Sequence, residues 1–415
     1  MSTEAQPGVH YEQLPPEFFN GPNPNRHADN ARLRSKCPVH QVNHPEGAEA
    51  YIVMDYETVS GMFSDPRLSK SVDKAPAWWQ ALLKDSSPTL IRNMLTADAP
   101  EHTRLRKLVA QAFTPRKMAA LRPRIQETTD DLIDALTDGE ADLFHEFALT
   151  LPLKVICEFL GVPFEDRDKL HEWGLLLSGA PYSTDEMNRK LKWASDSIEE
   201  YLKELLAARR EDLGDDLVST LIRAADEDGR FTNDELVSTL ILLINAGHKT
   251  TAYLISNGME ALFTHPDQME MLRNDPSLAP NAIEEFLRYQ PPVYRGTLRV
   301  AAEDMELAGV HIGKEAFVHL MINSANRDPE VFEEPDRLDI TRTGIRHFSF
   351  GHGAHFCPGS PLSRLEGEIA FNTLLRRLPD IALAVPPEEL EWLYDNSVGH
   401  GVSRLPVTFT KKLPR

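Results

Sequence analysis

A short segment near the end of the chain combines residue types that bind metals with residue types that shape a close-fitting loop. It reads Phe350-Gly351-His352-Gly353-Ala354-His355-Phe356-Cys357-Pro358-Gly359. Glycines adopt backbone conformations that other residues avoid, and they let the chain approach a flat ligand closely. A cysteine that precedes a helix is held as a thiolate by backbone N–H groups and by the positive end of the helix dipole. The segment therefore predicts that Cys357 is a ligand.

Two other roles for Cys357 remain open from the residues alone. A lone cysteine is often a small buried hydrophobe. Alternatively, the spacing of four residues is loosely typical of a zinc site: His347, His352, His355 and Cys357. Zinc does not account for the glycines or for Phe350, and no second Cys/His pair lies nearby in the sequence. The ligand role is favoured over both.

The segment resembles the haem-binding loop of the cytochromes P-450, which in many soluble bacterial members reads F-G-x-G-x-H-x-C-x-G. Every fixed position of that pattern is matched here. The resemblance implies that Cys357 binds the iron of haem b, and that Phe350, Gly351 and Gly359 shape the cofactor-binding loop. It implies O₂ as a co-substrate, because a thiolate ligand favours O–O cleavage.

Further motifs of the same family follow one another along the chain. Haem carries two propionates, which need cations or hydrogen-bond donors. The resemblance assigns this role to four residues: His102, Arg106, Arg299 and His355. Glu285 and Arg288, three apart on one predicted helix face, match the family's E-x-x-R ion pair. The segment Asn326-Arg327-Asp328-Pro329 resembles the meander that meets this pair.

The segment Ala246-Gly247-His248-Lys249-Thr250-Thr251 resembles the family's oxygen-activation motif, A-G-x-[acid]-T-T. The small residues Ala246 and Gly247 allow a local bulge of the helix, and Thr250 is expected to help deliver protons. Lys249 departs from the pattern, because a lysine with a pKa near 10.4 keeps its proton at neutral pH unless it is buried. Lys249 either relays protons after desolvation, or points to solvent, or reflects a reaction with weak proton delivery, such as oxidative coupling. We favour the second.

The family's pocket positions fall on side chains that suit a medium or large, mostly apolar molecule with a few polar groups. The residues expected to line the pocket are Trp78, Trp79, Leu175, Leu242, Leu243, Asn245, Val293, Tyr294, Arg295 and Val398. An internal salt bridge is the favoured role for Arg295, with a substrate carboxylate as the alternative.

Electrons must come from another protein, because no flavin or dinucleotide domain fits in this chain. The resemblance implies NAD(P)H, a ferredoxin reductase and a ferredoxin. With 44 basic and 64 acidic residues the net charge is −20, so a local basic cluster is informative. We expect an acidic ferredoxin to dock on Arg104, Arg106, Lys107, Arg116, Lys117 and Arg364, although a merely solvated helix face remains the alternative.

The elements that must position these residues are mostly helices. Apolar residues recur at helical spacing from about residue 100 to 288, and the longest run, 233–262, begins with a capping box formed by Thr232 and Glu235. Short strands are predicted at 50–54 and within 297–312, and a last helix at 361–378. We expect a mainly α fold with small β-sheets (α+β), and one domain, 1–415, with the haem between the long central helix and the cysteine loop. Its first 40 or so residues are expected to be rich in loops.

Composition limits the class of protein. A hydrophobic fraction of 41% is enough for a large core, and a net charge of −20 argues against nucleic acid as a partner. Three scattered cysteines, the absence of a signal peptide and the lack of about 20 consecutive apolar residues predict a cytoplasmic protein with no membrane span, expected to be a monomer. The predicted function is a haem-thiolate monooxygenase acting on a bacterial secondary metabolite. The alternatives are a P-450 that catalyses oxidative coupling, and a haem-binding sensor or carrier.

Overall fold

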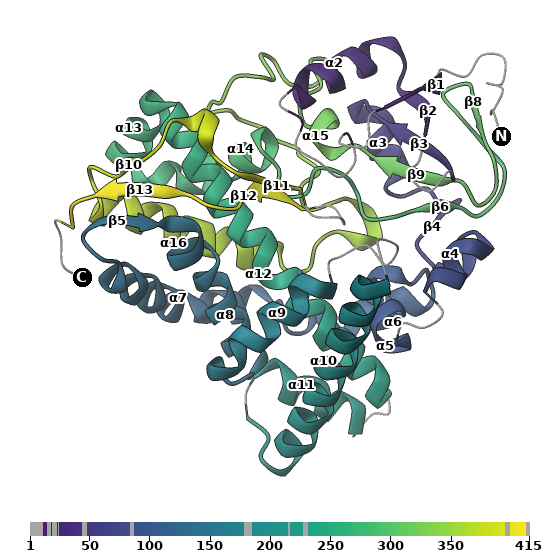
Figure 1. Ribbon diagram of the computed structural model, residues 1–415, viewed down its shortest axis with the longest axis horizontal. Helices are drawn as coiled ribbons and strands as arrows, with labels where there is room; N and C mark the ends of the chain where they lie inside the picture. The colour runs from purple at the N-terminus through teal and green to yellow at the C-terminus, as the bar shows by residue number, and fades with distance from the viewer. Residues whose placement is uncertain are drawn as a thin grey trace.

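The computed structural model describes residues 11–14, 18, 23, 25–43, 48–83, 87–177, 185–214, 216–226, 231–394 and 399–411. Helices make up most of this structure, and small sheets lie at its edges (Figure 1). The helices are α2 (Arg26–Lys36), α3 (Tyr56–Met62), α4 (Ala77–Leu82), α5 (Pro88–Ile91), α6 (Glu101–Ala110), α7 (Pro115–Ala135), α8 (Thr150–Leu160), α9 (Arg167–Leu177), α10 (Asp185–Glu211), α11 (Leu217–Asp226), α12 (Asn233–Thr264), α13 (Pro266–Asn274), α14 (Ala279–Tyr289), α15 (Ile322–Ala325) and α16 (Ser360–Arg377).

The strands form one larger sheet and three small ones. They are β1 (Tyr11–Glu12), β2 (Val39–Asn43), β3 (Glu49–Val53), β4 (Leu68–Ser69), β5 (Gly139–Asp142), β6 (Val300–Ala301), β7 (Met305–Leu307), β8 (Val310–Ile312), β9 (Phe317–Leu320), β10 (Ala382–Leu383), β11 (Trp392–Tyr394), β12 (His400–Val402) and β13 (Pro406–Phe409). The larger sheet has the order β1-β2-β3-β9-β6-β4, and the others pair β10-β13-β5, β11-β12 and β7-β8. The α+β prediction is confirmed.

Helix α12 passes through the middle of the molecule (Figure 1). Its 32 residues correspond to a length of about 48 Å. The predicted capping box is present: the Glu235 amide donates to Thr232 Oγ1 at 3.2 Å, and the Thr232 amide donates to Glu235 Oε2 at 2.9 Å. Helices α8, α14 and α16 pack around it, so that most of its side chains are buried. Despite this apolar surround, no helix among the described ranges is both long enough and apolar enough to cross a membrane.

The N-terminal region departs from the prediction of a loop. Helix α2 lies there and begins at Arg26, beyond the last proline of the proline-rich stretch. Its Leu33 is buried in the cluster that packs against β2, β3 and β9. The helix was missed because its mean hydropathy is low and few apolar residues mark its buried side; tertiary packing decides its place.

Candidate functional site

The loop that carries Cys357 leads from a turn into helix α16. Gly351 and Gly353 have φ values of +71° and +70°, in the left-handed region that favours glycine. At Gly353 a Cβ atom would lie 2.5 Å from Ser64 Oγ, so a larger residue has no room there. The amide of Cys357 donates to the carbonyl of Phe350 at 2.8 Å and closes the loop. This hydrogen bond holds Cys357 just before the N-terminus of α16, which begins at Ser360.

Opposing effects act on the Cys357 thiol. Burial raises its pKa, while the backbone N–H groups of Gly359 and Ser360 and the nearby guanidinium groups of Arg106 and Arg364 act to lower it. Burial has the larger effect, so the pKa of the thiol lies above its usual value. A bound metal cation favours the thiolate directly. The surroundings of the sulfur thus suit a metal ligand whose negative charge is stabilised by the bound metal cation.

The zinc arrangement considered for this region is not formed. Within the described ranges, no group of three or more His, Cys, Asp or Glu side chains is placed to hold a metal ion. His347 Nε2 instead lies 3.2 Å from a carboxylate oxygen of Glu284. The ring of His355 stacks on the ring of His102, with centroids 3.9 Å apart. The histidines near Cys357 in sequence therefore point to separate partners.

Four residues predicted to bind propionates come together from three parts of the chain. His102 and Arg106 lie on α6, Arg299 precedes β6, and His355 belongs to the cysteine loop. Burial lowers the pKa of Arg299 to about 10. Burial, with the nearby charges of Lys70, Arg299 and Arg106 and the ring of His102, lowers the pKa of His355 to about 2. The cluster is strongly electropositive and mostly sheltered from water.

This cluster fits a ligand with two carboxylates. No carboxylate among the described residues lies within ion-pair distance of Arg106 or Arg299, although Arg299 is only 3% exposed. Burying cations without a counter-charge is costly, so an anion is expected there when the protein is loaded. Haem presents one carboxylate pair and one iron, which matches the donor set of these cations and Cys357. Lys70, which the sequence did not single out, belongs to the same cluster.

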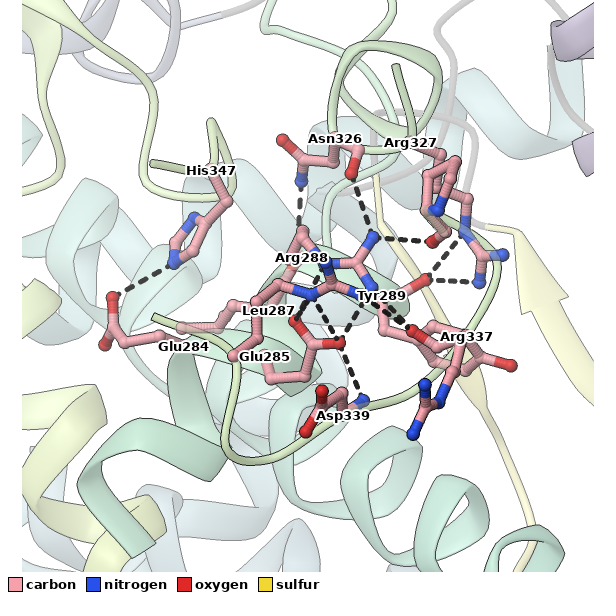
Figure 2. A network of polar contacts seen from close by, with 12 residues as sticks. Glu284, Glu285, Leu287, Arg288, Tyr289, Asn326, Arg327, Arg337, Asp339 and His347 are labelled. Carbon is pink, nitrogen blue, oxygen red and sulfur yellow. Dashed lines mark hydrogen bonds and ion pairs between the residues drawn. The ribbon is translucent and has the colours of Figure 1, made fainter. Parts of the chain in front are cut away.

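The predicted pair Glu285 and Arg288 is fully buried on α14 (Figure 2). Arg288 donates to both carboxylate oxygens of Glu285, at 2.7 and 2.8 Å. Its remaining N–H groups donate to three backbone carbonyls, those of Asn326, Pro335 and Arg337, at 2.7–3.1 Å. Every polar direction of the guanidinium is therefore used, which is why a buried arginine is tolerated there.

Asn326 connects this ion pair to the cysteine loop. Its backbone carbonyl accepts from Arg288, and its side-chain Oδ1 accepts from the amide of Phe348 at 2.8 Å. Its Nδ2 donates to Ser349 Oγ at 3.1 Å. Phe348 and Ser349 directly precede the loop that begins at Phe350. The meander predicted to meet the ion pair does so, and it positions the start of the cysteine loop.

On α12, the segment around Gly247 is closely packed. A Cβ atom at Gly247 would lie 2.9 Å from the Ile156 side chain of α8. Thr250 Oγ1 donates to the carbonyl of Ala246 at 2.9 Å, and Thr251 Oγ1 donates to Ser363 Oγ of α16 at 3.1 Å. Lys249 is only partly exposed, and its ammonium lies 5.9 Å from the ring centroid of Tyr253. The side chain of Lys249 is therefore partly exposed, and its role in proton delivery stays a prediction.

A histidine pair that the sequence did not single out ties α9 to the same segment. His248 is buried, and burial lowers its pKa to about 4. Its Nδ1 lies 2.8 Å from the carbonyl of Ile244, so this nitrogen carries the proton and donates. Its Nε2 then accepts from Nδ1 of His171 at 3.4 Å. Only the fold brings these residues together, because they are 77 positions apart.

The residues expected to line a substrate pocket lie in several places. Trp78 and Trp79 pack edge-to-face against Phe317 of β9. Asn245 Oδ1 is buried against Gly174 of α9. The others are placed as follows: Leu243 and Tyr294 are buried, Leu242 is half-buried, Val293 bridges to Gly399, and Arg295 donates to Tyr294 Oη at 3.2 Å and lies 3.0 Å from His319 Nδ1. Val398 and the side chain of Leu175 lie outside the described residues. Assignment of this set to a pocket remains a prediction.

The six cations expected to dock a ferredoxin are not equivalent. Arg104 forms an ion pair with Glu235 of α12, and Arg364 forms one with Glu284 at 2.6 Å. Arg106 belongs to the buried cluster. Three remain on the surface of α6 and the first turn of α7 with no ion-pair partner among the described residues: Lys107, Arg116 and Lys117.

Comparison with known proteins agrees with this geometry. The chain matches the family model described as Cytochrome P450 over residues 44–380. It is 42% identical over 390 residues to Cytochrome P450 107B1 of Saccharopolyspora erythraea, covering 92% of this chain and 94% of the relative. It is 41% identical to the monooxygenase PikC of Streptomyces venezuelae, covering 99% and 96%. The solved structure of CxnD, a P450 enzyme for C–S bond formation in chuangxinmycin biosynthesis, is 51% identical with a TM-score of 0.93, covering 99% and 100%.

Proposed function

Because this chain belongs to the cytochrome P450 family of haem monooxygenases, we propose that it inserts one oxygen atom from O₂ into a medium-to-large, mostly apolar secondary metabolite. The observation that carries the proposal is the junction of the Cys357 loop with a buried cluster of cations that lacks carboxylate partners. A thiolate ligand and a dianion site together suit haem.

In this proposal each part of the site has a separate task. Cys357 Sγ binds the iron, and Arg106, Arg299 and His102 hold the carboxylates. When bound, the haem supplies the oxidising chemistry, while the protein orients the substrate and excludes water. The buried ion pair Glu285–Arg288 keeps the cysteine loop in position through Asn326.

We assign proton transfer on the distal side to the Thr250 hydroxyl. Its hydrogen bond to the carbonyl of Ala246 is a local i to i−4 contact, which is readily exchanged for a partner in the pocket. Lys249 stands where the family has an acid, and its ammonium lies 5.9 Å from the ring centroid of Tyr253. Proton delivery through Thr250 and water, without a carboxylate at position 249, follows from this arrangement.

We further propose that electrons arrive from NAD(P)H through a ferredoxin reductase and an acidic ferredoxin that docks on Lys107, Arg116 and Lys117. These cations are exposed on α6 and the first turn of α7, on a chain whose net charge is −20. Complementary charge favours encounter and orientation. Reversal of charge at Lys107 and Lys117 is expected to slow reduction by ferredoxin without altering substrate-induced spectral shifts.

Oxidative coupling is a second candidate function, favoured by two observations. Lys249 stands in place of the acid that usually assists oxygen activation in the family. CxnD, which is 51% identical to this chain, is described as an enzyme for C–S bond formation. A coupling reaction removes two hydrogen atoms from the substrate and transfers no oxygen to it.

Turnover under ¹⁸O₂ distinguishes the two candidates. Secondary metabolites that produce a substrate-type spectral shift are incubated with ferredoxin, reductase and NADPH, and the products are analysed by mass spectrometry. Incorporation of one labelled oxygen supports oxygen insertion, whereas loss of two hydrogens without label supports coupling. A Cys357→Ala variant is the matched control and should give no product.

A further inference from the structure

Lys70 is a buried lysine directly after strand β4. Its residue exposure is 8%, and its Nζ donates to Thr297 Oγ1. No carboxylate within the described ranges lies within ion-pair distance of this ammonium, whereas a lysine is rarely buried without a partner. Arg299 and His355 are its close electrostatic neighbours. Hydrogen bonding to one threonine does not offset the burial of a full positive charge.

Among the described residues, Asp98 is the acidic group that acts on Lys70 and His102, and its hydrogen bonds go to other groups. One carboxylate oxygen accepts from the backbone amide of Lys70 at 3.0 Å, and the other accepts from the Ser69 hydroxyl. Three basic side chains gather here, Lys70, Arg106 and Arg299, and when all three are protonated they face the one negative charge of Asp98. The uncompensated charge of about two units matches the two carboxylates of haem.

The charged form of Lys70 also depends on whether an anion is present. Burial, with a contribution from the positive charge of Arg299, holds the pKa of Lys70 well below its usual range. A carboxylate close to the ammonium would oppose both effects and favour the charged form. The site is thus completed by an anion.

We propose that Lys70, directly after strand β4, is a third cationic anchor of the haem carboxylates. The motifs of the sequence account for Arg106, Arg299 and the two histidines, but for no residue of this strand. The inference rests on the proposed haem function, though not on which oxidation the enzyme performs. A structural role is the competing explanation, since the bond to Thr297 also ties β4 to the segment before β6.

Lys70→Gln separates the two explanations. Glutamine keeps a hydrogen-bond donor for Thr297 but has no charge. The holoenzyme is mixed with excess apomyoglobin, and the rate at which haem leaves is followed by absorbance. Loss of a hydrogen bond to a charged group is expected to speed haem release by about tenfold or more. Lys74→Gln, at an exposed lysine four residues further on, is the matched control and should leave the rate unchanged.

A second readout does not depend on the loaded enzyme. Thermal unfolding of the apoprotein should be unaffected by Lys70→Gln, or shifted to higher temperature, because an uncompensated buried charge is removed. A structural tie through Thr297 predicts a different pattern. Lys70→Gln, which keeps the donor, and Lys70→Met, which lacks it, would both release haem like the wild type, and Lys70→Met would lose equal stability in the apo and holo forms. That result would overturn the proposal. Lys70→Met carries the same expectations for haem release, and Lys70→Arg should restore retention.

One further outcome identifies another carboxylate as the partner. Lys70 lines a cavity of about 150 Å³ together with Trp79, Thr297 and Arg299. If Lys70→Gln releases haem at the wild-type rate but weakens the spectral binding of myristate, used as a carboxylate probe, the lysine serves a ligand in this cavity and the haem assignment is wrong. If the wild-type chain retains haem without thiolate ligation, the proposed function fails, but the Lys70 comparison still stands.

Discussion

Replacement of Arg288 by leucine is expected to be among the most damaging single changes in this protein. The variant removes two hydrogen bonds to Glu285 and the donors to three backbone carbonyls. It leaves the Glu285 carboxylate, whose side-chain exposure is 0%, with only Arg342 at 3.2 Å and the amide of Asp339 at 3.0 Å as partners among the described residues. Breaking a buried ion pair in this way costs about 3–5 kcal/mol, and each orphaned carbonyl adds about 1 kcal/mol or more. Since a whole domain is stable by only about 5–15 kcal/mol, little stability should remain.

The matched control is Arg337→Leu. Arg337 and Glu334 have the same i, i+3 spacing and an ion-pair distance of 3.0 Å, but both side chains are more than half exposed. An exposed pair contributes about 0–1 kcal/mol. Urea unfolding of both variants, followed by circular dichroism, gives the comparison. If the free energy of unfolding falls by no more than about 1 kcal/mol further in Arg288→Leu than in the control, burial does not strengthen this ion pair and the reasoning is refuted.

Four further changes test other parts of the molecule. Burial raises the pKa of Glu260 to about 7, so the folded chain binds this proton more tightly than the unfolded chain does. The free energy of unfolding should therefore fall by about 1–3 kcal/mol as the pH rises from about 4.5 to 7. In urea unfolding, Glu260→Gln should lack this pH dependence. Gly258→Ala brings a methyl group against Phe371 of α16 and should cost about 1–3 kcal/mol, measured by thermal unfolding; an unchanged midpoint contradicts the packing. Thr250→Ala should divert most electrons from product to peroxide, whereas Lys249→Glu should leave the coupling of electrons to product unchanged or improved; a large loss in Lys249→Glu shows that the lysine itself is needed.

Local sequence patterns predicted those parts of the fold that depend on neighbouring residues. The capping box at Thr232 and Glu235 and the long apolar run that follows predict α12 almost to its observed ends. The spacing of Glu285 and Arg288 predicts an ion pair, but the same spacing occurs at Glu334 and Arg337 on the surface. What separates the two is burial beneath the meander, which only the tertiary structure supplies.

The cation cluster illustrates the limit of sequence reasoning most clearly. His102 and Arg106 lie on one face of a helix and carry a recognisable spacing. Lys70 has no such signal: it follows a two-residue strand and meets Arg299 only because β4 pairs with β6. The one available cue was a lysine beside a strand whose other residues are buried. Arg104 shows the reverse case, since its helix position suggested a docking face, whereas its guanidinium pairs with Glu235.

The absorption spectrum of the dithionite-reduced protein under carbon monoxide tests the central claim most directly. Thiolate ligation by Cys357 predicts a strongly red-shifted Soret band that is absent in Cys357→Ala. A band at the position typical of a histidine ligand, in both the wild type and the variant, would contradict that claim and would favour a haem-binding sensor or carrier.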